Sequence, residues 1–570
     1  MQTVAQDRPW LKFYPADVPP SIEYPRKSLF SILLESAQKY PNKSALAYLG
    51  KKISYRELNE YVNQFANGLA SIGITKGSKV ALILPNLPQF VICFYGALKS
   101  GATVVCCNPL YKEKELEFQI ENSDAELVVL VNNIVGDHDF YSEFAKCKPR
   151  LSKVKYVFVT SVTDFLPSIK KQLAGPVKKI RKVDAPGAIN LVDFLKTHSK
   201  SEPDTESLKI DPMNDLAVIQ YTGGTTGISK GAMLTHYNLV TNAVALARWG
   251  GLGDEGINLA VIPFFHIYGL TVALNSPLYG GQKIVLLPSF DPKEVLETID
   301  KEKVSVFPGV PTMYIALLHN PGIGKYSLHT LKQCLSGAAG LPVEIKKKFD
   351  TTTGGNLVEG YGLTEASPVT HVNLVRAGTQ GKAGSIGFPL PDTDAKIVDI
   401  ETGTKDLPVG ETGELAIRGP QVMKGYWKSP GETEHVLHGE WLLTGDIARR
   451  DEDGYFYIID RKKDMINASG FKVWPREVEE VLFTHPDIKE AAVIGVPDQY
   501  RGENVMAFVV LKEKNRNPGA QAITAYCKER IAAYKVPRIV EFRDTLPKSL
   551  VGKVLRRKLR EEELSRKTST

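Results

Sequence analysis

The sequence predicts an α/β protein: a large N-terminal domain of two doubly wound α/β halves plus a small β subdomain, followed by a small mobile α+β C-terminal domain. Three observations support this prediction. Short apolar runs alternate with helix-like segments over residues 79–160 and again over residues 258–359. Such alternation is typical of parallel, doubly wound sheets. From residue 395 the elements become short and glycine-rich, and a charged run at residues 460–464 precedes the rest of the chain.

Length and composition limit the possible organisation. A chain of 570 residues is too long for one core, since domains usually contain about 100–200 residues. Its hydrophobic content of 43% and charged content of 24% are typical of a soluble globular protein. No apolar run is long enough to span a bilayer, and residues 1–20 lack the apolar core of a secretory signal. We therefore expect a cytoplasmic protein.

The cysteines and the net charge exclude further classes. The six cysteines include no C-x-x-C pair, and most lie in apolar stretches, so we expect buried free thiols in a reducing compartment. A net charge of +7 is small for a chain of this size and predicts no nucleic-acid partner.

The first α/β half follows two helix-like segments. Ser28 can cap a helix that extends to about residue 39, and residues 55–69 repeat apolar side chains at helical spacing. The pattern then alternates between short buried strands and helices. Strands are expected at residues 79–84, 103–107, 126–131 and 154–160. Helices are expected between them at residues 90–98, 113–120 and 140–147.

A basic amphipathic segment, residues 165–183, follows this half. Five apolar residues recur three or four apart: Leu166, Ile169, Leu173, Val177 and Ile180. Basic residues occupy other positions without any acid among them: Lys170, Lys171, Lys178, Lys179, Arg181 and Lys182. The pattern favours either peripheral contact with an anionic membrane or a surface insertion whose apolar stripe packs on its own domain. Gly175 and Pro176 interrupt it.

The glycine-rich stretch at residues 221–234 is the candidate phosphate-binding element. It follows a β-prone run at residues 216–219 and precedes a helix-like run from about His236, so we expect a loop leaving a buried strand. Its glycines, hydroxyls and Lys230 suit a polyphosphate. The P-loop pattern is not met, because Lys230 precedes Gly231 rather than Ser or Thr, and an ordinary kinase or GTPase is disfavoured. A flexible surface loop is the alternative.

The second α/β half is followed by a β subdomain and a predicted domain boundary. Strands are expected at residues 258–262, 283–287, 304–307, 333–336 and 356–359, with helices such as 292–301 and 342–351 between them. Residues 395–418, with a strand at 414–417, predict the β subdomain. The charged run at 460–464 predicts the domain boundary, which divides the chain into residues 1–460 and 461–570. A charged turn inside one domain is the alternative.

Four segments carry residue types that can perform chemistry. His266 lies in an aromatic setting at a predicted strand end, where a core histidine is the alternative. Residues 359–365 combine a ring, Tyr361, with the hydroxyl of Thr364 and the carboxylate of Glu365, which favours a nucleotide site with Mg²⁺. Two further segments each offer one charged side chain. Asp446, in a turn, suits ribose hydroxyls or its own backbone, and Lys553 follows a glycine on an expected exposed loop, where a solvated lysine is the alternative.

These segments, in this order and at these separations, closely resemble the adenylate-forming superfamily of acyl-CoA synthetases, acyl-AMP ligases and luciferases. The resemblance covers nearly the whole chain. Residues 444–446, 460–466, 469–471 and 475–479 resemble the fatty acyl-CoA synthetase signature, and residues 360–371, GYGLTEASPVTH, resemble the long-chain ligases. The basic segment fits that subgroup as well.

The resemblance implies an activity and its substrates. A fatty acid carboxylate would attack the α-phosphate of ATP to form an acyl-adenylate and pyrophosphate, and the thiol of coenzyme A would then displace AMP. Such chemistry depends on positioning and charge stabilisation. Mg²⁺ is the implied metal ion. A medium-chain or aromatic (coumarate-type) acid–CoA ligase, an acyl-AMP ligase feeding a carrier protein and a non-enzymatic lipid-binding scaffold are the alternatives.

The resemblance also implies roles for single residues. Lys553 would bridge carboxylate and α-phosphate, Thr364 would contact the α-phosphate, Glu365 would hold Mg²⁺, and His266 would lie where the acyl pocket opens. The implied ATP-binding residues are Thr222, Gly223, Gly224, Thr225, Thr226, Gly227, Lys230, Gly337, Ala338, Ala339, Tyr361, Gly362, Thr364, Asp446 and Arg461. Lys463 would be the hinge of the C-terminal domain, and Gly470 and Phe471 would line the coenzyme A path. A homodimer and a peripheral position at the inner face of the cell membrane are further expectations.

Overall fold

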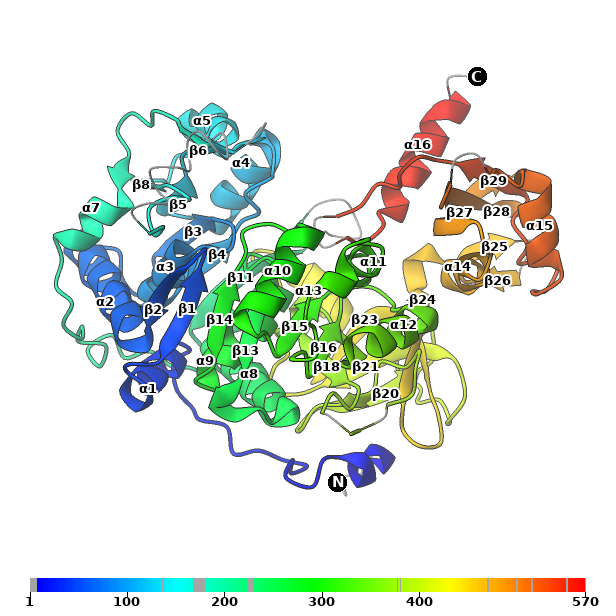
Figure 1. Cartoon of the computed structure of the whole chain (residues 1–570), viewed down its shortest axis with the longest axis horizontal. Coiled ribbons are helices and arrows are strands. Elements are labelled where there is room, and N and C mark those ends of the chain that lie inside the picture. The colour runs from blue at the N-terminus through cyan, green and yellow to red at the C-terminus, as the bar shows by residue number, and fades with distance from the viewer. Residues whose placement is uncertain are drawn as a thin grey trace.

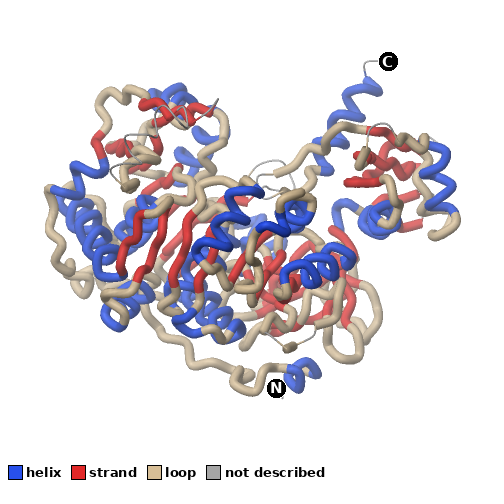
Figure 2. The backbone as a smooth tube through the Cα atoms, viewed as in Figure 1, coloured by secondary structure: helices blue, strands red, loops and turns tan. Residues whose placement is uncertain are grey.

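The computed structural model describes residues 8–135, 138–167, 180–222, 229–376, 378–379, 381–468, 471–498, 501–513, 516–549 and 552–568. The fold is mixed α/β, with a large N-terminal domain and a small C-terminal domain at one end of the molecule (Figure 1). Figure 2 shows the strands of the large domain grouped in the middle, with helices packed around them.

The first α/β half forms a seven-stranded sheet in the order β10-β8-β5-β3-β4-β11-β12. All neighbouring pairs are parallel except β11 and β12, which are antiparallel. β5 is buried along its whole length, as expected for a strand covered on both faces. The strands are β3 (Lys79–Ile83), β4 (Thr103–Cys106), β5 (Leu127–Val131), β8 (Tyr156–Thr160), β10 (Ile189–Asn190), β11 (Leu216–Thr222) and β12 (Lys230–Thr235).

Helices around this sheet match the predicted alternation. α3 is buried throughout, and α2 begins at a capping box in which Ser54 and Glu57 exchange hydrogen bonds. The helices are α1 (Ser31–Lys39), α2 (Tyr55–Ser71), α3 (Pro88–Lys99), α4 (Glu113–Ser123), α5 (Ser142–Cys147), α7 (Leu191–Lys196) and α8 (His236–Gly250).

The second half forms a nine-stranded sheet in the order β19-β18-β17-β16-β15-β13-β14-β1-β2. Its five predicted strands are present as the parallel group β13 to β17, while the early hairpin β1–β2 pairs with β14. The strands are β1 (Ser44–Tyr48), β2 (Lys51–Ser54), β13 (Ile257–Ala260), β14 (Lys283–Leu286), β15 (Val306–Gly309), β16 (Gln333–Ser336), β17 (Asn356–Gly362), β18 (Val369–Val372) and β19 (Phe388–Pro389). The helices are α9 (Ser276–Tyr279), α10 (Pro292–Glu302), α11 (Pro311–Leu318) and α12 (Val343–Thr353).

Three smaller sheets complete the described fold, and two of them, each of five strands, form the β subdomain and the sheet of the C-terminal domain. The β subdomain contains β20 (Asp394–Val398), β21 (Gly413–Arg418), β22 (Leu437–His438), β23 (Trp441–Arg450) and β24 (Phe456–Arg461), with α13 (Pro430–Val436) beside it. The C-terminal sheet contains β25 (Ile466–Ala468), β26 (Phe471–Val473), β27 (Ile488–Asp498), β28 (Gly502–Leu511) and β29 (Ile539–Phe542), with α14 (Pro475–Phe483), α15 (Ala520–Lys528) and α16 (Arg556–Thr568). The division at residue 460 stays a prediction.

Three local predictions were wrong. Ser28 does not cap the first helix, because α1 begins at Ser31 and its N-cap residue is Phe30, with no side-chain capping hydrogen bond. Residues 230–234, predicted as part of a loop, belong to strand β12. They pair antiparallel with β11 and form the last strand at one edge of the sheet. Residues 180–182 of the basic segment form β9 (Ile180–Lys182) instead of continuing the helical spacing, because they pair with β6 (Asn133–Val135) in a three-stranded sheet with β7 (His138–Asp139). Residues 168–179 of that segment lie outside the described residues.

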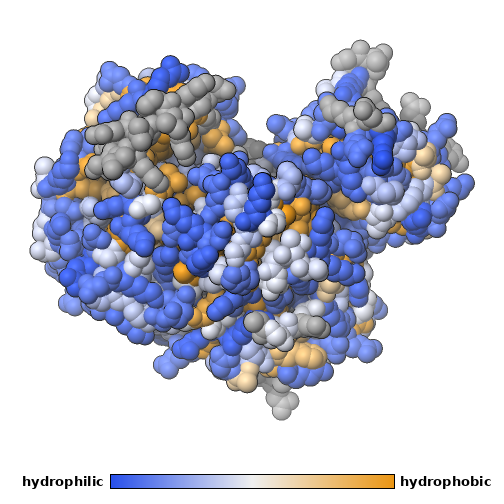
Figure 3. Space-filling model, in the orientation of Figure 1, coloured by the Kyte–Doolittle hydropathy of each residue, from blue (hydrophilic) through white to orange (hydrophobic). Residues whose placement is uncertain are grey.

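The buried cysteines and the mainly hydrophilic surface fit the expectations from the composition. All six cysteines are buried and free, which confirms the prediction of buried thiols. Figure 3 shows a face on which hydrophilic residues predominate and hydrophobic ones are scattered. Within the described part of the chain, no helix combines the length and the apolarity that crossing a bilayer requires.

Candidate functional site

A β-hairpin holds the base of the candidate phosphate-binding loop. Thr222, at the end of β11, lies opposite Lys230, at the start of β12. The hydroxyl of Ser229 donates a hydrogen bond of 2.6 Å to the carbonyl oxygen of Thr222, which holds the two strands together where the loop leaves them. The predicted phosphate ligands between them lie outside the described residues: Gly223, Gly224, Thr225, Thr226 and Gly227.

A chain of polar contacts links Lys230 to Glu365. The ammonium group of Lys230 forms an ion pair with Glu432 and lies 5.4 Å from the centroid of the Tyr426 ring. The Tyr426 hydroxyl donates a hydrogen bond of 2.6 Å to Glu365 Oε1. The predicted phosphate-binding cation and the predicted metal-binding carboxylate therefore share one neighbour.

The residues present fit a magnesium ion that shares its coordination with a polyphosphate. In proteins Mg²⁺ usually takes one or two carboxylates, with substrate phosphates and water completing its octahedron. Glu365 offers one such carboxylate, fixed from one side by Tyr426. No group of three or more histidine, cysteine, aspartate or glutamate side chains suited to a metal occurs within the described ranges. A dedicated protein cage is thus not the arrangement found there.

Asp446 joins the end of β17 to the β subdomain. Its Oδ2 accepts a hydrogen bond of 2.6 Å from the hydroxyl of Tyr361, and its Oδ1 lies 3.0 Å from Nε of Arg461. Asp446 and Arg461 are partners in the β23–β24 register. Burial, and then the negative charge of Asp446, raise the pKa of Tyr361 well above its usual value. Three predicted nucleotide-binding side chains therefore converge at one point.

Two loops at the strand ends line the same region. Gly362 ends β17, and a Cβ there would lie 2.1 Å from the carbonyl oxygen of Pro368, so only glycine fits. Thr364 and Glu365 follow in the 3-10 turn η6 (Thr364–Ala366). After β16, Ala338 has a φ of 66°, a left-handed conformation that is costly for a residue with a side chain and often marks a functional loop.

Lys553 reaches this region from the C-terminal domain. The Arg461 guanidinium, and then burial, lower the pKa of Lys553 to about 7, and the attraction of Asp446 and Asp464 opposes this effect. Burial, and then the charge of Lys553, lower the pKa of His266 to about 4. Lys553 is therefore within electrostatic range of both Arg461 and His266. The prediction that Lys553 lies on an exposed loop is wrong, because the residue is half-buried.

The predicted hinge and coenzyme A residues lie beyond β24. Lys463 lies in the 3-10 turn η7 (Lys462–Asp464), and burial lowers its pKa. Its neighbour Lys462 is tied to Glu414 of β21, with an Nζ–Oε2 distance of 2.8 Å. Phe471 is 55% exposed and its ring stacks on Tyr534 with centroids 4.7 Å apart. Gly470 lies outside the described residues.

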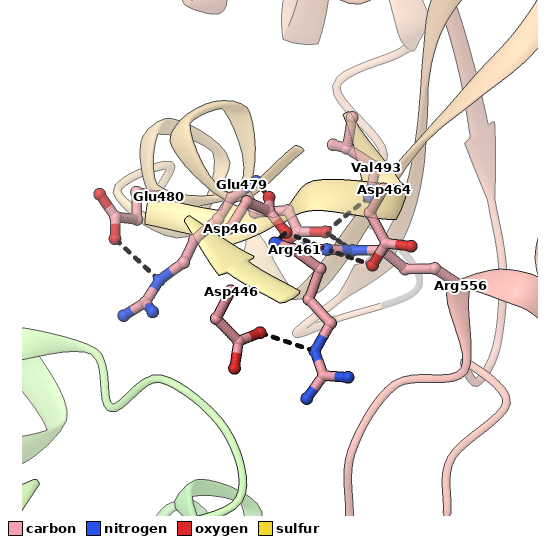
Figure 4. A network of polar contacts seen from close by, with 9 residues as sticks. Asp446, Asp460, Arg461, Asp464, Glu479, Glu480, Val493 and Arg556 are labelled. Carbon is pink, nitrogen blue, oxygen red and sulfur yellow. Dashed lines mark hydrogen bonds and ion pairs between the residues drawn. The ribbon is translucent and has the colours of Figure 1, made fainter. Parts of the chain in front are cut away.

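Arg556 is the centre of a buried charge cluster at this junction (Figure 4). Its Nη1 lies 2.7 Å from Asp460 Oδ1 and 3.2 Å from Asp464 Oδ2, and its Nη2 lies 2.7 Å from Glu479 Oε2. The carboxylates also accept backbone N–H groups, Asp460 from Arg476 at 2.6 Å and Glu479 from Val493 at 2.8 Å. The cluster therefore joins the end of β24, the turn η7, α14 and the start of α16.

Sequence reasoning missed three residues of the site: Tyr426, Glu432 and Arg556. Glu432 is 202 residues from Lys230 along the chain, and Tyr426 meets β12 through an isolated bridge to Ala232. No local pattern marks either contact. Arg556 lies in a basic run with Arg557 and Lys558, in which composition alone does not separate a buried cation from solvated ones.

Removing the Arg556 charge should destabilise the C-terminal domain. In an Arg556→Gln variant we expect the free energy of unfolding to fall by about 3–5 kcal/mol, because Glu479 and Asp460 would remain buried without a counter-ion. Hydrogen exchange of the Val493 and Arg476 amides measures this loss. The loss of stability should be smaller at low pH. Burial already raises the pKa of Glu479, and the protonated carboxyl of Glu479 needs no cation.

Arg557→Gln is the matched control for this variant. Arg557 is exposed and pairs with Glu561 one turn along α16, so its removal should cost about 0.5 kcal/mol or less. Equal exchange rates in the two variants would contradict a structural role for the Arg556 cluster.

Comparison with known proteins gives the family. The model of the AMP-binding enzyme family matches residues 33–427, and that of the AMP-binding enzyme C-terminal domain matches residues 477–553. The chain is 47% identical to a long-chain-fatty-acid–CoA ligase of Bacillus subtilis (strain 168) and 40% identical to one of Yersinia pestis, with 98% of each chain covered in both cases.

Among solved structures, MatB from Rhodopseudomonas palustris is 30% identical, and the match covers 94% of this chain and 98% of MatB. The TM-score is 0.81 with the ATP-bound form and 0.71 with the apo form, so the present arrangement is closer to the ATP-bound one. The chain belongs to the AMP-binding enzyme family.

Proposed function

We propose that this member of the AMP-binding enzyme family ligates a long-chain fatty acid to coenzyme A through an acyl-adenylate, consuming ATP and releasing AMP and pyrophosphate. The observation that carries the proposal is the convergence of Tyr361, Asp446 and Arg461, with Lys553 near enough to Arg461, Asp446 and His266 for their charges to affect one another. The curated relatives with the same activity match over nearly their whole length, which supports the choice of acid and acceptor.

The charges of the site account for the first half-reaction. A carboxylate oxygen of the fatty acid forms a bond to the α-phosphorus of ATP while the bond from that phosphorus to the β-phosphate oxygen breaks, and pyrophosphate leaves. Two anions must approach each other. Lys553 supplies a cation where they meet, and the incoming charges raise its pKa from about 7 and favour the ammonium form.

Other residues would hold the substrates in line. Lys230 would exchange Glu432 for the terminal phosphates, and Thr364 would donate to the α-phosphate. Asp446 would accept the ribose hydroxyls beside Arg461, with the Tyr361 ring against the adenine and residues 337–339 along its edge. Glu365 would hold Mg²⁺, which, when bound, neutralises phosphate charge. His266, neutral with a pKa of about 4, would border the acyl pocket without adding a second cation.

The second half-reaction requires a different arrangement of the C-terminal domain. The present arrangement brings Lys553 to the residues proposed for adenylation, so attack of the coenzyme A thiol on the acyl carbon would follow a movement of the C-terminal domain. We place the hinge at Lys463, in the short turn between the sheet of β24 and the sheet of β25. After rotation Gly470 and the exposed ring of Phe471 would line the path of the coenzyme.

Localisation and assembly remain predictions. Contact of the basic segment with anionic lipid would bring the enzyme to a membrane in which long-chain acids partition. This part of the proposal depends largely on residues outside the described ranges. A homodimer likewise stays a prediction.

Pyrophosphate release with a panel of acids, with and without coenzyme A, tests the proposed activity. We expect release with long-chain acids, and steady turnover only when coenzyme A is present. A strong preference for medium-chain or aromatic acids would show that these acids, and not long-chain fatty acids, are the substrates. Transfer to a carrier protein instead of coenzyme A would replace the acceptor, and no release with any acid would contradict the ligase activity.

Lys553→Ala should abolish acyl-adenylate formation and spare thioester formation from supplied acyl-adenylate. In the wild type, kcat/KM for adenylation should fall as pH rises through about 7, because the free enzyme then loses the ammonium proton. Lys553→Arg should rescue poorly but remove this decline, since guanidinium stays charged. Equal loss of both half-reactions in Lys553→Ala would contradict the assigned role.

Lys463→Pro tests the hinge. Proline restricts φ, so we expect acyl-adenylate to form while its conversion to thioester slows. Rapid-quench measurement of each half-reaction separates the two steps. Lys462→Ala serves as a neighbouring control that removes a charge but leaves the backbone free. Unchanged overall turnover of Lys463→Pro would place the hinge elsewhere.

A further inference from the structure

Gly552 and Thr312 touch across the junction of the two domains. Gly552 directly precedes Lys553, and Thr312 lies in the first turn of α11, after strand β15 of the second sheet. A Cβ on Gly552 would lie 2.1 Å from Oγ1 of Thr312, 3.2 Å from its Cβ and 3.4 Å from its Cγ2. Glycine at position 552 therefore approaches Thr312 more closely than a residue with a Cβ atom could.

The Thr312 side of this contact is rigid. Met313, Tyr314 and Leu317 of α11 are buried. The Tyr314 hydroxyl donates a hydrogen bond of 2.7 Å to the carbonyl oxygen of Phe307, and its ring meets Phe349 with centroids 5.0 Å apart. A helix fixed in this way to β15 and α12 cannot yield readily to an atom added at Gly552.

The Gly552 side is constrained on both flanks of the loop. The Ser549 amide donates to the Lys553 carbonyl oxygen at 2.7 Å, and the Lys553 amide donates to Ser549 Oγ at 3.1 Å. Arg556, three residues further on, is held by its carboxylates. Because the loop is closed on itself, a displacement at Gly552 passes directly to Lys553.

We propose that Thr312 and Gly552 form a steric seat, in which Thr312 is a positioning residue that sets how far Lys553 enters the site during adenylation. The inference rests on the proposed function, whose first step needs the ammonium group between two anions. A misplacement of about 1 Å can cost about a hundredfold in rate. The seat belongs to this domain arrangement, since rotation at the hinge would carry Gly552 away from α11.

Allele-specific rescue tests the seat. Gly552→Ala should slow acyl-adenylate formation by about a hundredfold and leave thioester formation from supplied acyl-adenylate within about twofold of wild type. Adding Thr312→Ala removes Oγ1 and Cγ2 and leaves the Cβ of residue 312, at 3.2 Å, as the nearest atom, so the double variant should recover about tenfold or more of the lost rate. Thr312→Ala alone gives the reference rate for this comparison.

Two controls separate the steric contact from backbone strain. Gly552 has a φ of 71°, so alanine there is strained whatever its surroundings. Gly519 has a φ of 83° and nothing within 4 Å of an added Cβ, so Gly519→Ala reproduces the strain without the contact and should keep both half-reactions. Gly552→Ala with Thr312→Val keeps an atom near the position of Oγ1 and should not recover.

Hydrogen exchange over residues 547–556 gives a readout that does not depend on catalysis. Protection should fall in Gly552→Ala and return in the double variant with Thr312→Ala. A double variant as slow and as exposed as Gly552→Ala, or an equal loss of both half-reactions, would overturn the seat. If the wild type formed no acyl-adenylate, the proposed function would fail, while rescue of protection would still decide whether Thr312 seats the loop.

Discussion

The buried charge cluster around Arg556 is the interaction on which the arrangement of the site depends. One guanidinium satisfies Asp460 at the end of β24, Asp464 in the hinge turn and Glu479 on α14. These carboxylates cost free energy when buried, and a shared cation together with backbone N–H groups offsets that cost. Because Arg556 lies three residues after Lys553, the same cluster fixes the base of the loop that brings Lys553 to the large domain.

The site itself brings cations together before any anionic substrate is present. Arg461, and then burial, lower the pKa of Lys553, whereas burial, and then the charge of Lys553, lower the pKa of His266. Phosphates and a carboxylate at this site would relieve part of the repulsion among its cations, so the arrangement favours anionic ligands. Neutral His266 fits this scheme, since a third cation would increase the repulsion without contributing a better-placed charge.

At the proposed phosphate side, the two described charged residues, Lys230 and Glu365, each have a protein partner. Lys230 is paired with Glu432, and Glu365 accepts the Tyr426 hydroxyl. Both partners come from the segment that crosses β12 near Ala232, so they hold the two functional side chains in place while leaving them within reach of a ligand. ATP and its metal ion would have to replace these contacts, which couples their binding to a local rearrangement of residues 426–432.

The sequence by itself determined the two alternating α/β halves, the β subdomain and the compact C-terminal unit, because strand and helix periodicities are local properties of the chain. Roles for Tyr361, Asp446, Arg461 and Lys553 follow from the resemblance of the motifs to the adenylate-forming superfamily and stay predictions, while the structure brings the first three into contact. That β1 and β2 join the second sheet could not be predicted, because β1 pairs with β14, far along the chain. Residues 230–234 form a strand because they pair with the preceding strand β11, whereas the glycine-rich composition of this stretch favoured a loop. The contacts of Tyr426, Glu432, Arg556 and Thr312 could not be predicted either, because their partners lie on other elements and packing sets such contacts without leaving any periodicity in the chain.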